Sequence, residues 1–338
     1  MEALNRRNFL RSASIVGTTL AIGVPRVARA ADFQYKLGTD APNGHPVNIR
    51  LQEAADAIRK KSNGSVDIQL FPNNQLGGST DMLSQVRAGG IEFLSIPTSI
   101  LSVIVPVAAI CGIGFAFKNY DAVWQAMDGD LGAYIRAETL KVRLVAMEKI
   151  LDNGFRQIST SSRSINSPAE LNGLKIRVPP SPMWTSLFRA LKAAPTSINF
   201  AELYSALQTK IVDGQENSLP IINAGKLYEV QKYCSMTNHM WDGYWVVANQ
   251  AAFMAMPKDL REIVAQSFET AALAQRADIF SLSNSLRPSL EQSGMVFNQP
   301  ATAPFRAALS TSGFYAEWKQ TFGADPWALL EKYSGTLV

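Results

Sequence analysis

Few residues of this chain have a type and spacing that would support catalysis or metal binding. The 338 residues include only two histidines, His45 and His239, and two cysteines, Cys111 and Cys234. None of them lies in a spacing typical of a zinc or haem site, and the sequence has no GxSxG nucleophile elbow. Carboxylate pairs stay open as general acids or bases, since any α/β protein has many. The pattern favours a binding function that uses no cofactor and no metal. For Cys111 and Cys234 we favour two buried thiols over a disulfide.

The strongest candidate for ligand binding is an arginine at the end of a predicted strand. Apolar residues alternate with Lys175 and Arg177 before Pro179-Pro180, and a helix start follows at Ser181-Pro182. An open α/β sheet binds small ligands at the carboxyl ends of its strands, beside helix N-termini. A guanidinium placed there needs a carboxylate, from the protein or from a ligand. From the pattern alone we favour a protein salt bridge for Arg177.

Other polar and aromatic residues would fit the same cleft. Arg156 follows a predicted lobe boundary, and two arginines entering one cleft would form a bidentate anion clamp. Asn217 would add an amide donor, although a turn role is favoured on sequence alone. Residues 241–245 form an aromatic cluster in which alternation along a strand would turn some rings toward the cleft and others into the core. For any single ring of this cluster, core packing is the favoured interpretation. Thr98 is a further candidate contact.

Hydrophobic periodicity predicts alternating strands and helices. The expected strands are residues 33–38, 66–71, 91–96 and 174–178, and the expected helices are residues 47–61, 181–191, 201–210 and a segment that opens at the Gly-rich turn 77–80. Right-handed crossovers would make the first three strands parallel. Residues 258–287 predict one or two long helices able to pack across both halves of the chain. The repeated pattern predicts two α/β lobes.

Residues 93–117 contain no charged residue and imitate a membrane span. Pro97, Pro106, Gly112 and Gly114 interrupt them. Four short buried segments of an α/β core fit these breaks better than one continuous apolar helix. We therefore expect a chain that is not embedded in a membrane.

The first 30 residues have the layout of a cleavable export signal. A charged start precedes a weakly apolar middle and the small-residue ending Ala28-Arg29-Ala30, and Arg6-Arg7-Asn8-Phe9-Leu10 resembles a twin-arginine motif. Five of the 32 Lys and Arg residues and one of the 28 Asp and Glu residues lie there, so the rest of the chain carries 27 of each sign. We predict a twin-arginine signal peptide at residues 1–30 and a periplasmic location, and we expect no nucleic-acid partner.

Six blocks of the chain carry a family resemblance. The most specific are Leu174–Pro179, Phe200–Gln208 and Val212–Asn217, and Asn74–Gly78, Gly154–Arg156 and Tyr228–Tyr233 agree. Over residues 33 to about 330 the chain resembles the substrate-binding proteins of tripartite ATP-independent periplasmic (TRAP) transporters, of the DctP type. Such a protein is a receptor and not an enzyme: it captures an organic acid by its carboxylate and delivers it to the TRAP membrane permease subunits.

The resemblance implies a two-lobed, periplasmic-binding-protein-like α/β fold. A ligand cleft would lie between the lobes, with crossing strands and a long helix that spans both. The implied lobe I consists of residues 31–153 and 242–281, and lobe II of residues 154–241 and 282–338.

The resemblance also assigns roles to individual residues. The match to the family's carboxylate-pairing arginine falls on Arg177, which reverses the preference for a protein salt bridge there. Arg156 would be the second arginine and Asn217 a polar contact. His45, from the first loop, would either reach the cleft or pack at a helix start.

Departures from the family bear on the substrate. Ser79 stands where many relatives have Glu, and Ser218 where they often have Pro. The rings that would line an apolar pocket beside the arginines are those of Trp184, Phe200, Tyr204 and Trp241. They favour a monocarboxylate with an apolar or aromatic body over a sugar acid or a short dicarboxylate. A ligand sensor that reports to a receptor, a periplasmic enzyme, and a metal ion bridging the carboxylate stay open as alternatives.

Overall fold

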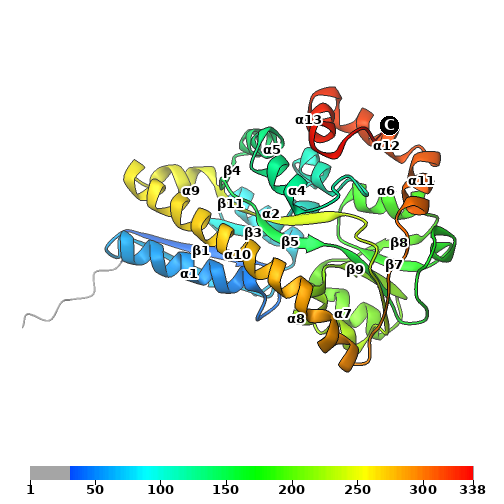
Figure 1. Ribbon diagram of the computed structural model, residues 1–338. Helices are drawn as coiled ribbons and strands as arrows, with labels where there is room; N and C mark the ends of the chain where they lie inside the picture. The colour runs from blue at the N-terminus through cyan, green and yellow to red at the C-terminus, as the bar shows by residue number, and fades with distance from the viewer. Residues whose placement is uncertain (1–30, 338) are drawn as a thin grey trace, which may run out of the picture. The chain divides into compact units, whose positions relative to one another are not determined.

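Two mixed β-sheets form the framework of residues 31–337, the part of the chain that the computed structural model describes (Figure 1). The predicted signal peptide, residues 1–30, lies outside these described residues. The strand order is β2-β1-β3-β11-β4 in the first sheet, where β5 also pairs with β11, and β12-β10-β6-β9-β7-β8 in the second. The strands of the first sheet are β1 (Phe33–Thr39), β2 (Val66–Phe71), β3 (Phe93–Pro97), β4 (Leu144–Ala146), β5 (Leu151–Phe155) and β11 (Trp241–Asn249). Those of the second are β6 (Gln157–Thr160), β7 (Lys175–Val178), β8 (Ala194–Ser197), β9 (Gly214–Asn217), β10 (Tyr233–Ser235) and β12 (Val296–Asn298).

Each sheet combines parallel and antiparallel pairs. Strand β1 pairs in parallel with β2 and β3, as predicted from the right-handed crossovers, whereas β11 is antiparallel to β3, β4 and β5. In the second sheet β7 is parallel to β8 and β9, and β6 is antiparallel to β9 and β10. The two-lobed α/β fold is therefore confirmed, with one sheet in each lobe.

Helices cover both sheets. Those that follow strands of the first sheet are α1 (Pro46–Lys61), α2 (Ser79–Ala88), α3 (Thr98–Leu101), the 3-10 helix η1 (Pro106–Gly112), α4 (Tyr120–Met127), α5 (Asp130–Lys141) and α9 (Gln250–Ala255). Those around the second are η2 (Pro168–Leu171), α6 (Pro182–Ala190), α7 (Phe200–Gln208), α8 (Leu219–Ala224) and η3 (Leu227–Glu229). After the long α10 (Lys258–Gln292) come α11 (Ala303–Thr311), α12 (Phe314–Phe322) and α13 (Ala324–Ser334).

Helix α1 illustrates how the sequence pattern becomes structure. Its buried stripe includes Leu51, Ala55 and Ile58, which recur at helical spacing. His45 caps the first turn by accepting a hydrogen bond from the Val47 N–H at 3.3 Å. Basic residues fill the last turn, where the helix dipole favours positive charge. The predicted helix of residues 47–61 is confirmed, and its apolar face packs on the first sheet.

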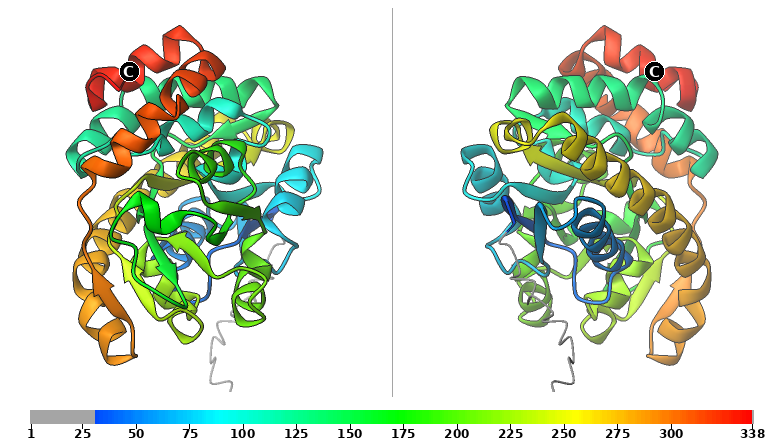
Figure 2. Two further views of the ribbon diagram at one scale, coloured as in Figure 1. Left: turned by 90° about the vertical axis from the view of Figure 1, so that its right-hand side faces the viewer. Right: turned by 90° about the vertical axis from the view of Figure 1, so that its left-hand side faces the viewer.

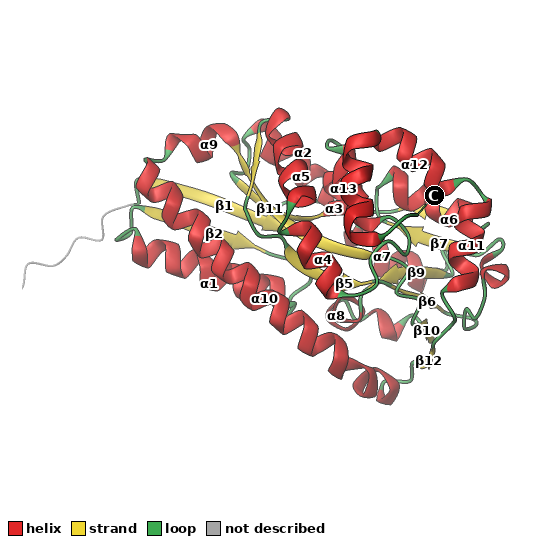
Figure 3. Cartoon of the chain, turned by 45° about the horizontal axis from the view of Figure 1, so that its top comes forward, coloured by secondary structure: helices red, strands yellow, loops and turns green. Residues whose placement is uncertain are grey.

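The chain passes between the two sheets at Arg156, the single residue between β5 and β6. It returns between β10 and β11. Helix α10 packs against α1 and β5 and, toward its other end, against α8 (Figures 2 and 3). Within it, Gln275 accepts a hydrogen bond from the Asp152 N–H at 2.7 Å and donates one to the Asp152 carbonyl at 2.8 Å. The predicted crossing strands and long spanning helix are present, and this helix holds β5 just before the crossing.

The charge-free stretch of residues 93–117 forms β3, α3, η1 and a short irregular segment. All but a few of its side chains are buried. Within residues 31–337 no helix is both long enough and apolar enough to cross a membrane. The prediction of short buried segments is confirmed.

The C-terminal helices contact elements that lie far earlier in the sequence. Helix α13 packs against α4, α5 and η1, while α12 and α11 pack against α6. The division of residues 31–338 into lobes at positions 153, 241 and 281 remains a proposal.

Candidate functional site

A small enclosed cavity lies where strand ends of both sheets meet. Asp40 follows β1, Pro97 ends β3, Arg177 lies in β7 and Asn217 ends β9. The cavity has a volume of about 20 Å³, roughly the room of one water molecule, so a larger solute needs the lining to move apart. Its lining consists of Asp40, Ser79, Pro97, Ser99, Ile100, Asn153, Arg156, Arg177, Pro179, Phe200, Asn217, Ile221 and Tyr244.

Arg177 is a buried cation without a carboxylate partner among the described residues. Its side chain is held by a hydrogen bond from Nε to the Ile198 carbonyl at 2.9 Å, and its guanidinium lies 6.0 Å from the ring centre of Phe200. Burial lowers the pKa of Arg177 to about 10, so the group stays charged at neutral pH. A guanidinium has five N–H donors, and the four on its two terminal nitrogens suit a bidentate carboxylate. The protein salt bridge that the local pattern favoured is therefore wrong.

Arg156 is bound to protein carboxylates instead. Its Nε and Nη2 donate to the two carboxylate oxygens of Glu216 at 2.5 and 2.8 Å, and its Nη1 donates to Asp242 Oδ2 at 3.1 Å. Nη2 also donates to the Glu216 carbonyl at 2.8 Å, so one Nη1 N–H is left for another partner. The short crossing between β5 and β6 places Arg156 against β9 and β11, where these carboxylates lie. Its positive charge is thus compensated within the protein.

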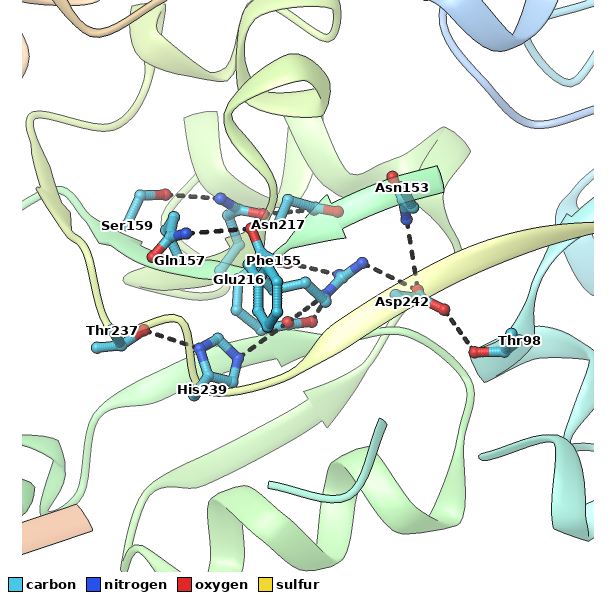
Figure 4. Close-up of polar contacts among 12 residues, drawn as sticks. Thr98, Asn153, Phe155, Gln157, Ser159, Glu216, Asn217, Thr237, His239 and Asp242 are labelled. Carbon is cyan, nitrogen blue, oxygen red and sulfur yellow. Dashed lines mark hydrogen bonds and ion pairs between the residues drawn. The ribbon is translucent and has the colours of Figure 1, made fainter. Parts of the chain in front are cut away.

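Glu216 and Asp242 link Arg156 to further polar side chains (Figure 4). Glu216 also contacts His239 Nε2 at 3.2 Å, and Asp242 accepts hydrogen bonds from Thr98 at 2.5 Å and Asn153 at 3.4 Å. Burial would raise the pKa of Glu216, but Arg156 and His239 outweigh it and hold this pKa below its usual value. Burial raises the pKa of Asp242 despite the opposing charge of Arg156.

Asp40 brings a carboxyl group to the cavity lining, separate from the carboxylates that bind Arg156. Its Oδ2 accepts a hydrogen bond from the Ser79 hydroxyl at 2.6 Å, whereas its Oδ1 is buried and has no hydrogen-bond partner. Burial raises the pKa of Asp40 to about 6, although Ser79, Arg177 and Tyr244 oppose the rise. Ser79 thus holds the Asp40 carboxylate in place.

The structure brings four of the predicted ligand contacts into the cavity lining. These are Arg156, Arg177, Phe200 and Asn217. Asn217 is the last residue of β9 rather than a turn residue, and its Nδ2 donates to Gln215 Oε1 at 2.6 Å.

Five predicted contacts lie outside the lining. Trp184 is buried in the main hydrophobic core, and half-buried Tyr204 donates a hydrogen bond to Glu229 at 2.7 Å. Trp241 is buried in the same core and donates from its indole N–H to Asp152 at 2.8 Å. Thr98 contacts Asp242, as described above, and His45 caps α1. The expected wall of four rings is therefore wrong for this cavity, because helical or strand spacing turns Trp184, Tyr204 and Trp241 elsewhere.

Sequence reasoning missed several lining residues, of which Asp40, Asn153 and Tyr244 are the most polar. A usable signal was present for Asp40, which directly follows a predicted strand, the same argument that selected Arg177. Of the rings in the 241–245 cluster, that of Tyr244 lines the cavity. The centres of the His45 and Tyr244 rings lie 6.3 Å apart. Both cysteines are buried free thiols, as predicted.

A buried arginine without a salt-bridge partner among the described residues, at a strand end where the two α/β lobes meet, suits the binding of a small anionic solute. The chain belongs to the DctP family, described as bacterial extracellular solute-binding protein, family 7, whose model matches residues 37–319. This confirms the resemblance to TRAP substrate-binding proteins and a binding function rather than an enzymatic one.

Relatives and solved structures agree with this assignment. An uncharacterized protein, y4mM, of Sinorhizobium fredii is 35% identical over 81% of this chain, which spans half of that protein's length. The C4-dicarboxylate-binding periplasmic protein DctP of Rhodobacter capsulatus is 30% identical over 73% of this chain and 74% of its own. A TRAP periplasmic solute-binding protein from Polaromonas, bound to D-erythronate, superposes with a TM-score of 0.85 at 26% identity, covering 88% of this chain and 98% of that one.

Proposed function

We propose that this protein is the extracytoplasmic receptor of a TRAP transporter and binds a small organic acid through Arg177. The observation that most supports this proposal is the buried guanidinium of Arg177, which has no protein carboxylate partner among the described residues and lines a cavity between the lobes. A solute carboxylate would supply the missing partner through two charge-assisted hydrogen bonds. The bound form would then be read by the membrane permease, which is the partner that the family implies.

The lining supports a monocarboxylate more than a dicarboxylate. Arg177 is the lining cation that protein carboxylates leave free, since Arg156 is already shared between Glu216 and Asp242. A second solute carboxylate in the cavity would meet Asp40, which would repel it. The lining offers mostly polar groups beside the Phe200 and Tyr244 rings, so we no longer favour a purely apolar body for the acid.

Closure of the lobes provides the mechanism for capture. Contacts between the lobes flank the cavity: the Ser102 and Ser181 hydroxyls lie 3.0 Å apart, and Asn199 Nδ2 donates to Thr80 at 3.3 Å. A solute that bridges Arg177 and groups of the other lobe would favour the closed form over the open one. The affinity of the receptor therefore includes the free energy of this conformational change.

A ligand screen tests this proposal. Protein starting at Ala31 is unfolded and refolded to remove bound solute, and its melting temperature is measured with hydroxy, keto, sugar, aromatic and dicarboxylic acids. At 100-fold excess over Kd a ligand adds about 2.7 kcal/mol, which raises the melting temperature by roughly 4 °C or more at this size. The stabilisation should be lost in Arg177→Ala and kept in Arg189→Ala, a control on the exposed face of α6. No shift with any acid in refolded protein would refute the proposal.

We further propose that residues 1–30 direct export by a twin-arginine-like route, which places the receptor in the periplasm. The paired Arg6-Arg7 and the charge excess that ends at Ala30 support this. Periplasmic fractions should contain a chain beginning at Ala31, and Arg6→Lys with Arg7→Lys should retain the precursor in the cytoplasm. Normal export of that double variant would exclude the twin-arginine route.

A further inference from the structure

Asp40 is the one carboxyl group in the described lining of the cavity, and it forms no salt bridge with either lining arginine, whereas Arg156 pairs with Glu216 and Asp242 outside the lining. The side chain is 3% exposed, and one of its two oxygens, Oδ1, has no hydrogen-bond partner. A buried acceptor without a donor is unfavourable, and native proteins rarely retain one without a reason. The atom lines the same cavity as Arg177, so a solute held at Arg177 would lie beside it.

The groups around Asp40 come from four elements. Ser79, at the start of α2, donates a hydrogen bond to Asp40 Oδ2. Arg177 of β7 lowers the pKa of Asp40 by its charge. From β11, the charge of Asp242 raises this pKa, and a hydrogen bond with the Tyr244 hydroxyl lowers it. Because the pKa is about 6, Asp40 is mostly ionised at neutral pH and its oxygens are hydrogen-bond acceptors only. The donor that fits Oδ1 is therefore a hydroxyl or an N–H group.

We propose that Asp40 determines specificity by accepting, at Oδ1, a hydrogen bond from a hydroxyl group of the solute, so that this receptor selects short hydroxy acids. The proposal rests on the proposed function, since Arg177 holds the carboxylate end of the same solute. Both Arg177 and Asp40 face the small cavity, so the hydroxyl belongs within a few atoms of the carboxylate. An amine would also fit as a donor, but it would bring a cation beside Arg177.

Charge balance supports a neutral donor and a single solute carboxylate. Arg156 lies between Glu216 and Asp242, and this trio carries one net negative charge when all three are ionised. Arg177 and Asp40 cancel each other, and a solute carboxylate adds a second negative charge. A hydroxyl group satisfies Asp40 Oδ1 without adding a third.

Matched pairs of acids test this proposal by calorimetry on refolded protein. The pairs are lactate and propanoate, and 2-hydroxybutanoate and butanoate. A site that binds a solute hydroxyl with a buried polar group rejects the analogue that lacks it. We expect the wild type to prefer the hydroxy member of a pair by at least about tenfold.

The variants separate Asp40 from its surroundings. Asp40→Ala should reduce the preference to less than about threefold while binding still depends on Arg177. Asp259→Ala, which removes an exposed carboxylate in the first turn of α10, outside the cavity lining, should keep the preference. Asp40→Asn, whose amide oxygen can still accept a hydrogen bond, is the second variant if Asp40→Ala does not fold, and it should keep part of the preference.

The possible failures are distinguishable. If the wild type binds an acid through Arg177 but treats both members of every pair alike, or if Asp40→Ala keeps the full preference, the role of Asp40 is refuted and the proposed function stands. If no acid binds to the wild type, the proposed function itself fails.

Discussion

Replacing Glu216 by glutamine tests whether Arg156 is a structural group rather than a second ligand arginine. Glu216 is fully buried and receives two hydrogen bonds from Arg156 through its carboxylate and one contact from His239. The substitution keeps the shape of the side chain and removes its negative charge. Arg156 would then face Asp242 alone in a buried site.

The expected loss of stability is large. Removing one partner of a buried ion pair destabilises a protein by about 3–5 kcal/mol, because the remaining charge is buried without full compensation. Unfolding of the roughly 300 described residues has an entropy of about 0.6 kcal/mol per degree, from about 2.1 cal/mol/K per residue. Glu216→Gln should therefore lower the melting temperature by about 5–8 °C.

Calorimetric melting between pH 3 and pH 8 provides the assay. The pKa of Glu216 is held below its usual value in the folded protein, so its contribution is present above the unfolded pKa and is lost as the pH falls through the folded pKa. The difference between wild type and Glu216→Gln should therefore shrink at low pH. Glu291→Gln, which removes an exposed pair with Arg287, should change stability by no more than about 0.5 kcal/mol.

A double variant tests the coupling between Glu216 and Arg156. Because Glu216→Gln leaves Arg156 with Asp242 as its remaining salt-bridge partner, the two positions are coupled, and the loss in the Glu216→Gln/Arg156→Met double variant should be smaller than the sum of the two single losses. A decrease below 1 °C in Glu216→Gln, or a double variant with fully additive losses, would contradict the structural role of this pair.

Three further outcomes follow from buried groups. The folded-state pKa of Asp40, about 6, exceeds its unfolded value, so the contribution of Asp40 to stability falls as the pH rises from 4 to 8. In urea unfolding, Asp40→Asn should therefore gain about 3 kcal/mol relative to the wild type over this range, and a constant difference would contradict this. A methyl group at Gly112 would lie 2.4 Å from Trp184 Cη2, so Gly112→Ala should destabilise by at least about 1–3 kcal/mol, and unchanged stability would contradict this packing. Burial raises the pKa of both Cys111 and Cys234 to about 12, so a thiol reagent at pH 8 should label neither cysteine in the native protein and both cysteines after unfolding. Rapid labelling of the native protein would contradict their burial.

The elements of the fold with strong periodicity could be predicted from the sequence. Strands β1, β2, β3 and β7 and helix α1 have clear alternation or an apolar stripe bounded by turn residues. Strand β8, with the sequence Ala-Pro-Thr-Ser, has neither apolar alternation nor high β-propensity, and only its pairing with β7 makes it a strand. Short strands of this kind depend on tertiary contacts that a local pattern does not contain.

The candidate site could be predicted only in part. The position of Arg177 at a strand end identified it, but its charge partners depend on which strands lie beside β7, and the sequence pattern favoured a salt bridge that is absent. Arg156 pairs with Glu216 and Asp242 because the chain crosses between sheets there, a contact across 60 and 86 residues of sequence. The orientation of Trp184 and Trp241 into the core was likewise set by packing, and spacing alone did not reveal it.

The most direct test of the central claim is a crystal structure of the refolded protein with the acid that stabilises it most. We predict that the carboxylate of this acid accepts hydrogen bonds from both terminal nitrogens of Arg177, in the cavity beside Asp40 and Phe200. Arg156 should remain bound to Glu216 and Asp242. An acid bound elsewhere on the molecule, with Arg177 turned to a protein carboxylate, would contradict the account.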